Sequence, residues 1–174
     1  GTVASPPWRL KSDVRWMPDQ PQPIRVRARI TDTKGITYLT PPVENVIQQR
    51  THRGVRLIKP TLVPERWASR AGKESAKGTI EVSAGDLAGA TFARLVVSTW
   101  SGDVEDTSTH ELRLNGERLA SRFGEFHNYD HDAVEVPLAR LKTGTNELSL
   151  FSTFQGHMFE INWPGPTLLI EYKK

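Results

Sequence analysis

The feature that most constrains the fold is a tight turn in the second half of the chain. Asn115 and Gly116 stand between two short runs, 111–114 and 117–119, in which apolar and polar residues alternate. An Asn-Gly pair favours the positive φ angles of a two-residue type I′ turn, which joins neighbouring antiparallel strands. The sequence therefore predicts a β-hairpin here and favours antiparallel β-structure around it.

Other short segments also have the pattern of strands, and Gly, Pro and Asn separate them. The run 92–100 is rich in Val and Leu and is expected to be a central strand covered on both faces. The other expected strands are 24–30, 36–39, 43–47, 55–58, 79–82, 133–138, 147–152 and 167–172. A single helical turn is expected at most, at 64–67. The pattern predicts an all-β fold, a two-sheet antiparallel β-sandwich (jelly roll) with little or no helix.

The chain has 174 residues, enough for one domain of ordinary size. Residues 1–23 are Pro-rich and are predicted to be an arm or linker that Trp8 and Trp16 anchor to the body. Residues 24–174 are predicted to form the sandwich. The alternative is an Ig-like portion at 24–78 followed by a jelly roll at 79–174. No run approaches the roughly 18 apolar residues of a membrane span, so none is expected.

Four segments in the second half carry a family resemblance. They read LAGATFARLVVSTW at 87–100, HELRLNGERL at 110–119, VPLARLKTGTNELSL at 136–150 and WPGPTLLIEY at 163–172. This half resembles the galactose-binding-like jelly-roll modules appended to secreted polysaccharide-degrading enzymes. The resemblance implies a carbohydrate-binding module in a secreted or cell-surface protein, with a structural Ca²⁺. The implied partners are a polysaccharide or oligosaccharide and the other domains of a parent chain.

Two loops carry most of the histidines and several carboxylates. The candidate ligand-binding residues in them are Tyr129, His127, His131, His157 and Glu160. Imidazole and carboxylate groups on converging loops suit a transition metal, but they suit a polar ligand or ordinary packing as well. The sequence leaves these three interpretations open.

An acidic loop at 101–108 is the candidate calcium site. Asp103, Glu105 and Asp106 stand beside Gly and Ser, and Ca²⁺ prefers such oxygen ligands. Their spacing does not match an EF-hand loop. The alternative is a solvated surface loop.

Arg25, Arg27 and Arg29 alternate with apolar residues in the first expected strand. On one strand face they would form a row with about 6.6–6.8 Å between neighbours. Guanidinium groups bind carboxylates and sulfates in a bidentate manner, so the row suits an anionic polysaccharide. The alternative is a solvent-facing strand with salt-bridged arginines. The net charge is only +3 and no nucleic-acid-binding motif is present, so nucleic acid is not an expected partner.

Exposed aromatic rings are the other means of binding sugars, because apolar sugar faces stack on them. Tyr129 and Trp67 lie in polar loops and are the expected exposed rings. Trp163 precedes Pro-Gly-Pro and is expected to be a core anchor.

Three functional classes follow from these features. The leading one is a non-catalytic carbohydrate-binding module, and the second is a structural or protein-contacting accessory domain. The third is a polysaccharide lyase or hydrolase that uses His and Glu of the two loops. No nucleophile elbow or phosphate-binding loop is present, which favours a protein that is not an enzyme.

Overall fold

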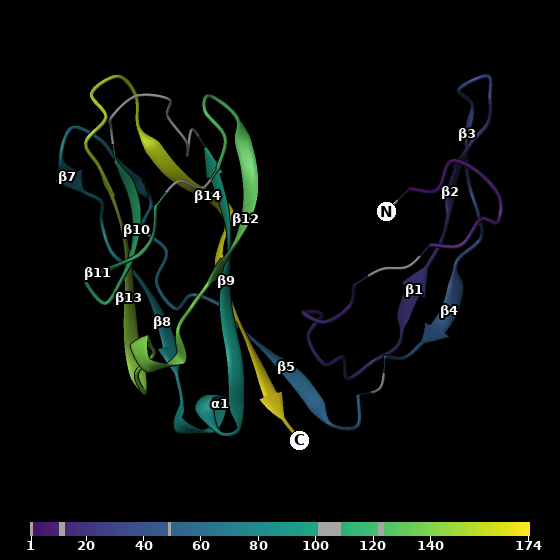
Figure 1. Ribbon diagram of the computed structural model, residues 1–174, viewed down its shortest axis with the longest axis horizontal. Coiled ribbons are helices and arrows are strands. Elements are labelled where there is room, and N and C mark those ends of the chain that lie inside the picture. Colours follow the sequence, from purple (N-terminus) through teal and green to yellow (C-terminus); the bar gives the residue numbers. More distant parts are fainter. Residues whose placement is uncertain (1, 11–12, 49, 101–108, 122–123) are drawn as a thin grey trace.

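The computed structural model describes residues 2–10, 13–48, 50–100, 109–121 and 124–174. Two regions are visible in Figure 1: a β-sandwich that begins at residue 53, and a pair of narrow β-ribbons that precede it in the chain and lie outside the sandwich.

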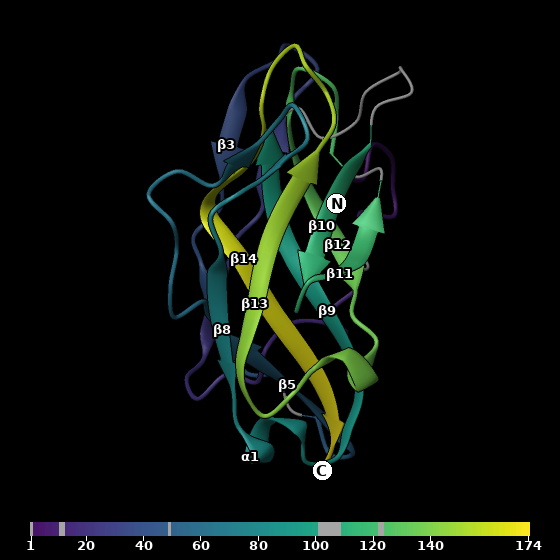
Figure 2. The ribbon, with the colours of Figure 1, turned by 90° about the vertical axis from the view of Figure 1, so that its left-hand side faces the viewer.

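The first sheet of the sandwich has the strand order β11–β10–β13, with β7 and β8 both paired to the other edge of β13. Its strands are β7 (Lys73–Glu74), β8 (Gly78–Val82), β10 (His110–Leu114), β11 (Glu117–Ser121) and β13 (Gly144–Ser152). All pairs are antiparallel, and Figure 2 shows this sheet in front of the second one.

The second sheet has the order β12–β9–β14, with β5 and β6 both paired to the other edge of β14. Its strands are β5 (Arg53–Ile58), β6 (Ala68–Ser69), β9 (Ala90–Trp100), β12 (Tyr129–Glu135) and β14 (Phe159–Lys173). Strand β9 is central, as the sequence predicts. The predicted all-β, two-layer antiparallel sandwich is confirmed.

The predicted hairpin joins β10 to β11. Asn115 and Gly116 have φ angles of 54° and 84°, which are the positive values that a type I′ turn needs. Helix is confined to α1 (Ala84–Leu87) and the 3₁₀ turn η1 (Leu138–Arg140) among the described residues. Ser83 and Asp86 form a capping box at the start of α1. The turn expected at 64–67 is not helical.

The core lies between the two sheets and follows the period-two pattern of their strands. Leu148 and Leu150 of β13 face Leu95 and Val97 of β9 and Phe159 of β14 across it, and each of them is buried. Such alternation is what a strand with one inward face requires.

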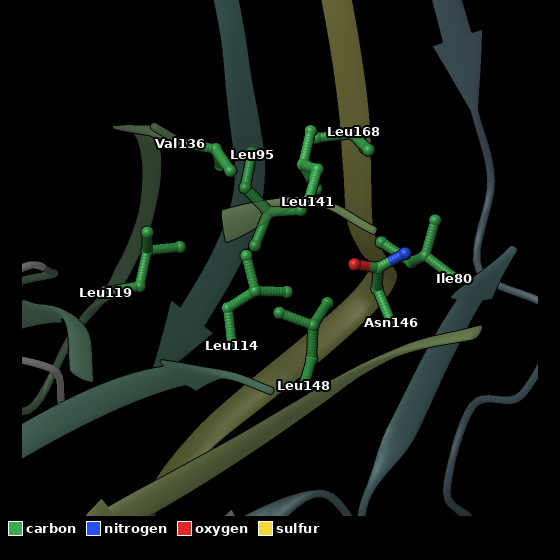
Figure 3. Close-up of a pocket in the computed structure, with 9 residues that line it drawn as sticks. All are labelled: Ile80, Leu95, Leu114, Leu119, Val136, Leu141, Asn146, Leu148 and Leu168. Atoms are coloured by element: carbon green, nitrogen blue, oxygen red, sulfur yellow. The ribbon is translucent and has the colours of Figure 1, made fainter. Parts of the chain in front are cut away.

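One small void remains in the core, and Figure 3 shows the side chains around it. Its volume of about 10 Å³ is no more than one water molecule needs, so it is not a ligand site. Asn146 is the polar residue of its wall, and its amide is bonded to Asn115, Lys142 and Gly144. The void is therefore a packing feature.

The ribbons are two sheets of two strands each. The strands β1 (Ile24–Val26) and β4 (Val43–Val46) form one ribbon, and β2 (Arg29–Thr31) and β3 (Thr37–Leu39) form the other. The expectation of one half-buried strand at 24–30 is wrong, because β1 ends at Val26, β2 begins at Arg29 and the two have different partners. The apolar side chains of Val26 and Ile30 are exposed.

The N-terminal arm contacts the second sheet at its outer face. Arg15 pairs with the buried carboxylate of Glu171 at 3.1 Å, and the guanidinium of Arg94 lies 4.5 Å from the ring of Trp16. Trp16 is thus an anchor as predicted, whereas Trp8 is exposed. Within the described residues, no helix is long and apolar enough to cross a membrane.

Candidate functional site

A bulge in the middle of β14 is the most unusual local feature of the sandwich. Asn162 pairs with Ser98 of β9, but the next paired residue of β14 is Thr167, opposite Val96. Residues 163–166 of β14 therefore lie opposite the single residue Val97 of β9. This segment is not paired with β9. Gly165 in this segment has a φ of 78°.

The bulge presents Trp163 to solvent, with 87% of its surface exposed. The expectation that Trp163 anchors the core is wrong, because the bulge lifts it out of the sheet. The expectation that Trp67 is exposed is also wrong, since Trp67 is 4% exposed. Its ring packs on Gly78, where an added Cβ would overlap it.

A groove of about 250 Å³ lies between the bulge and the segment that precedes β6. Its walls combine apolar side chains with a few polar groups: Val63, Pro64, Glu65, Trp67, Ile161, Asn162, Trp163 and Gly165. The exposed Trp163 and the buried Trp67 both belong to its lining. A concave, largely apolar surface with a few polar groups is the usual form of a small-molecule site.

Two donors in the lining have no hydrogen-bond partner among the described residues. They are Nε1 of Trp67 and Nδ2 of Asn162, and both atoms are buried. Leaving such a donor unsatisfied costs about 1–3 kcal/mol. Glu65 adds an exposed carboxylate to the same lining. A ligand hydroxyl in the groove could donate a hydrogen bond to the Glu65 carboxylate.

The outer face of the second sheet continues the site across its strands. Side chains of directly paired residues point to the same face, so Tyr129, Trp100 and Glu160 form one row on β12, β9 and β14. His131, Ser98 and Asn162 form the next row.

A hydrogen bond confirms the orientation of the second row. Nδ1 of His131 lies 2.8 Å from Oγ of Ser98, so these two side chains share a face. Asn162 belongs both to this row and to the groove. The groove therefore adjoins the outer face at Asn162.

The two histidine loops converge at the end of the sheet. The rings of His127 and His157 lie 4.4 Å apart between centroids, and His157 also lies 5.2 Å from Trp100. Phe126 stacks on His127 at 4.3 Å, and Phe154 contacts His157 at 4.6 Å. The structure thus brings the predicted His127 and His157 together with Trp100, beside the row that holds Tyr129 and Glu160.

No group of three or more metal-ligating side chains occurs within the part of the chain that the structure describes. The calcium residues Asp103, Glu105 and Asp106 lie outside that part, so this site stays a prediction. Near the histidine loops, burial raises the pKa of Asp132 above its ordinary value of 3.8, and the charge of Asp130 adds to the effect.

The predicted arginine row lies on the ribbons and not on the sandwich. Arg25 is on β1 and Arg29 on β2, with Arg27 between the two strands, and all three are exposed. Arg25 pairs with Glu44 of β4 at 3.2 Å. The structure does not bring these residues to the groove, and their binding of an anionic glycan stays a prediction.

Sequence reasoning missed Trp163, Asn162 and Glu65 as site residues. The signal for Trp163 was present, because Pro-Gly-Pro inside an otherwise strand-like segment marks a bulge or a break in the ladder. Nothing in the sequence places Glu65 beside Asn162, since that proximity depends on the crossing of two segments far apart in the chain.

No protein-family model and no curated protein matches the chain. Among solved structures, the chain is similar to BpGH86A, a β-porphyranase of glycoside hydrolase family 86 from the human gut bacterium Bacteroides plebeius. The identity is 12% and the TM-score 0.49, and the similarity covers 85% of this chain and 29% of that protein. The chain thus spans less than a third of that protein's length, and the likeness assigns neither a family nor an activity.

Proposed function

We propose that the protein is a non-catalytic carbohydrate-binding module whose primary binding site is the groove beside Trp163. The observation that carries the proposal is an indole exposed on a bulge, next to a largely apolar groove whose lining includes the Glu65 carboxylate. The apolar face of a sugar ring stacks on an exposed indole, and its hydroxyl groups donate hydrogen bonds to a carboxylate.

The lining of the groove favours binding over hydrolysis. Most glycoside hydrolases place two carboxyl groups on either side of the scissile bond, roughly 5–10 Å apart. Among the described residues that line the groove, Glu65 is the one carboxylate. One carboxylate is enough to accept a hydroxyl hydrogen bond and fix the orientation of a sugar.

The test is affinity electrophoresis of the purified protein in gels that contain neutral, uronic-acid or sulfated polysaccharides. We expect retardation by at least one glycan and a loss of affinity of about 30-fold or more for Trp163→Ala, the effect of removing a central aromatic contact. Because Trp163 is almost fully exposed, the variant should unfold within about 0.5 kcal/mol of the parent.

Trp8→Ala is the matched control, because Trp8 is an exposed indole in the N-terminal arm, away from the groove. It should bind like the parent. Equal retardation of parent and Trp163→Ala would contradict the groove as the site. Absence of retardation on every glycan would contradict carbohydrate binding and favour an accessory domain that contacts protein. A second gel series with EDTA tests the predicted calcium dependence.

A further inference from the structure

We infer that the ligand is an uncharged glycan chain that lies across β14, β9 and β12, from Trp163 to Tyr129. This inference rests on the proposed function and specifies its substrate class. Two observations carry it: the line of side chains across the outer face of the second sheet, and the charge of that face.

The line of side chains has an exposed ring at each end. Trp163 stands at the groove on β14, and Tyr129, which is 68% exposed, stands at the edge strand β12. Asn162 adjoins Trp163 along β14, and the bonded pair Ser98 and His131 leads from it to β12, where His131 is two residues from Tyr129. Aromatic rings at both ends with hydrogen-bonding groups between them match the alternating apolar and polar surface of a sugar chain.

The separation of the two rings sets a minimum ligand size. Strands β14 and β12 are both neighbours of β9, so the two rings are at least two strand spacings apart, about 10 Å, and they are also offset along the strands. One sugar ring does not span that distance. A single sugar contacts the groove alone, and several linked sugars are needed to reach Tyr129.

The charged groups along this line do not favour an anion. Glu65 lines the groove, and Glu160 lies in the row with Trp100 and Tyr129. A uronate or sulfate there would meet carboxylates, and like charges at close range repel. Arg66 follows Glu65 in the chain. Its guanidinium nitrogen Nη2 lies 3.0 Å from the sulfur of Met158.

Two arginines of the outer face are paired with other groups, Arg94 with the N-terminal arm and Arg53 of β5 with Glu171 at 3.2 Å. Arg94 of β9 lies against the ring of Trp16 at 4.5 Å. The exposed row Arg25, Arg27 and Arg29 is on the ribbons. The exposed arginine row and the sugar-binding line are therefore in different places, which makes the two ligand classes experimentally separable.

The first experiment compares matched polymers by affinity electrophoresis: hydroxyethylcellulose with carboxymethylcellulose, and agarose with carrageenan. We expect the neutral member of a pair to bind at least tenfold more tightly than its anionic counterpart, and its binding to be unchanged between 50 and 500 mM NaCl, concentrations that bracket physiological screening. Tighter binding of the anionic member that is lost in salt would overturn the inference and move the site to the arginine row. Absence of binding to all four polymers would overturn it as well.

The second experiment uses calorimetry with the neutral oligosaccharides of the backbone that binds, from one to six sugars. Affinity should rise with length until the chain reaches Tyr129. Trp163→Ala should weaken every length, whereas Tyr129→Ala should weaken the longer oligosaccharides about tenfold and leave the shortest unchanged. Tyr38→Ala, an exposed tyrosine of β3, is the control and should change nothing.

The outcomes separate this inference from the proposed function. If a monosaccharide binds as tightly as a hexasaccharide and Tyr129→Ala has no effect while Trp163→Ala does, the groove is a sugar site but the extended line is wrong. If neither variant changes binding, both the groove and the line are wrong.

Discussion

The sandwich and the ribbons contain the same sequence pattern but bury it very differently. In β13, Leu148 and Leu150 have no exposed surface, because a second sheet covers them. In the ribbons, Val26 is 47% exposed and Ile30 is 53% exposed, although both stand between polar neighbours. Alternation therefore predicts a strand, but burial depends on whether another layer covers the apolar face.

The sandwich and the region before it are also stabilised by different kinds of contact. The sandwich is stabilised by buried apolar area between its sheets. The region before it is attached by polar contacts, among them the pair of Arg15 with Glu171 and that of Asp19 with Lys174 at 3.0 Å. An isolated two-stranded ribbon is marginally stable in water, so we expect the ribbons to open before the sandwich.

The largest expected contrast comes from truncating an apolar side chain in each region. Leu150→Ala should lower the free energy of unfolding by about 2–5 kcal/mol, because it leaves a cavity in the core. Val43→Ala should change it by less than about 0.5 kcal/mol, because its side chain is mostly solvated. Urea unfolding followed by tryptophan fluorescence measures both. Equal losses would mean that the ribbon is covered in solution.

A glycine in each region gives a smaller contrast. Gly78→Ala would place a methyl group on the ring of Trp67, and we expect a loss of about 1–3 kcal/mol together with a shift in tryptophan emission. Gly35 has a φ of 81° and open space around it, so Gly35→Ala should strain only its own turn, by about 1 kcal/mol. Hydrogen exchange should locate the second effect at β2 and β3 alone. An unchanged emission spectrum for Gly78→Ala would contradict the packing of Trp67.

The smallest contrast is in the pH dependence of two aspartates. Burial acts to raise the pKa of Asp19, but Lys174 above all, with Tyr172 and the backbone of Val55, holds it below its ordinary value of 3.8. A lowered pKa means stability that is present above pH 3.8 and is lost as the pH falls through the lower value of the folded state. Asp19→Asn should therefore destabilise the protein at neutral pH, and the difference should vanish in acid.

Asp132 should behave in the opposite way, because burial raises its pKa. Its carboxylate destabilises the folded state above the raised pKa, and protonation relieves this as the pH falls. Asp132→Asn should unfold at a higher urea concentration at pH 7 and should match the parent in acid. Urea midpoints from pH 3 to pH 8 measure both variants. The same sign for the two variants would contradict the assigned environments.

The local signals in the sequence were reliable where a few adjacent residues decide the backbone. Asn115–Gly116 predicted the hairpin and 92–100 predicted a central strand, because turn chemistry and a continuous apolar run are local properties. The exposure of Trp67 and Trp163 was predicted the wrong way round. A side chain's exposure depends on which segments cross over it, and that information is not local.

The sequence by itself determined the class of fold and the turn at Asn115, because each follows from short-range patterning. Only the tertiary structure brought together the residues of the proposed site. The bulge that exposes Trp163 and the groove that joins Glu65 to Asn162 depend on the pairing of β14 with β9 and on the segment that precedes β6. These contacts link residues far apart in the chain, and their geometry is fixed only when both sheets have closed on the core.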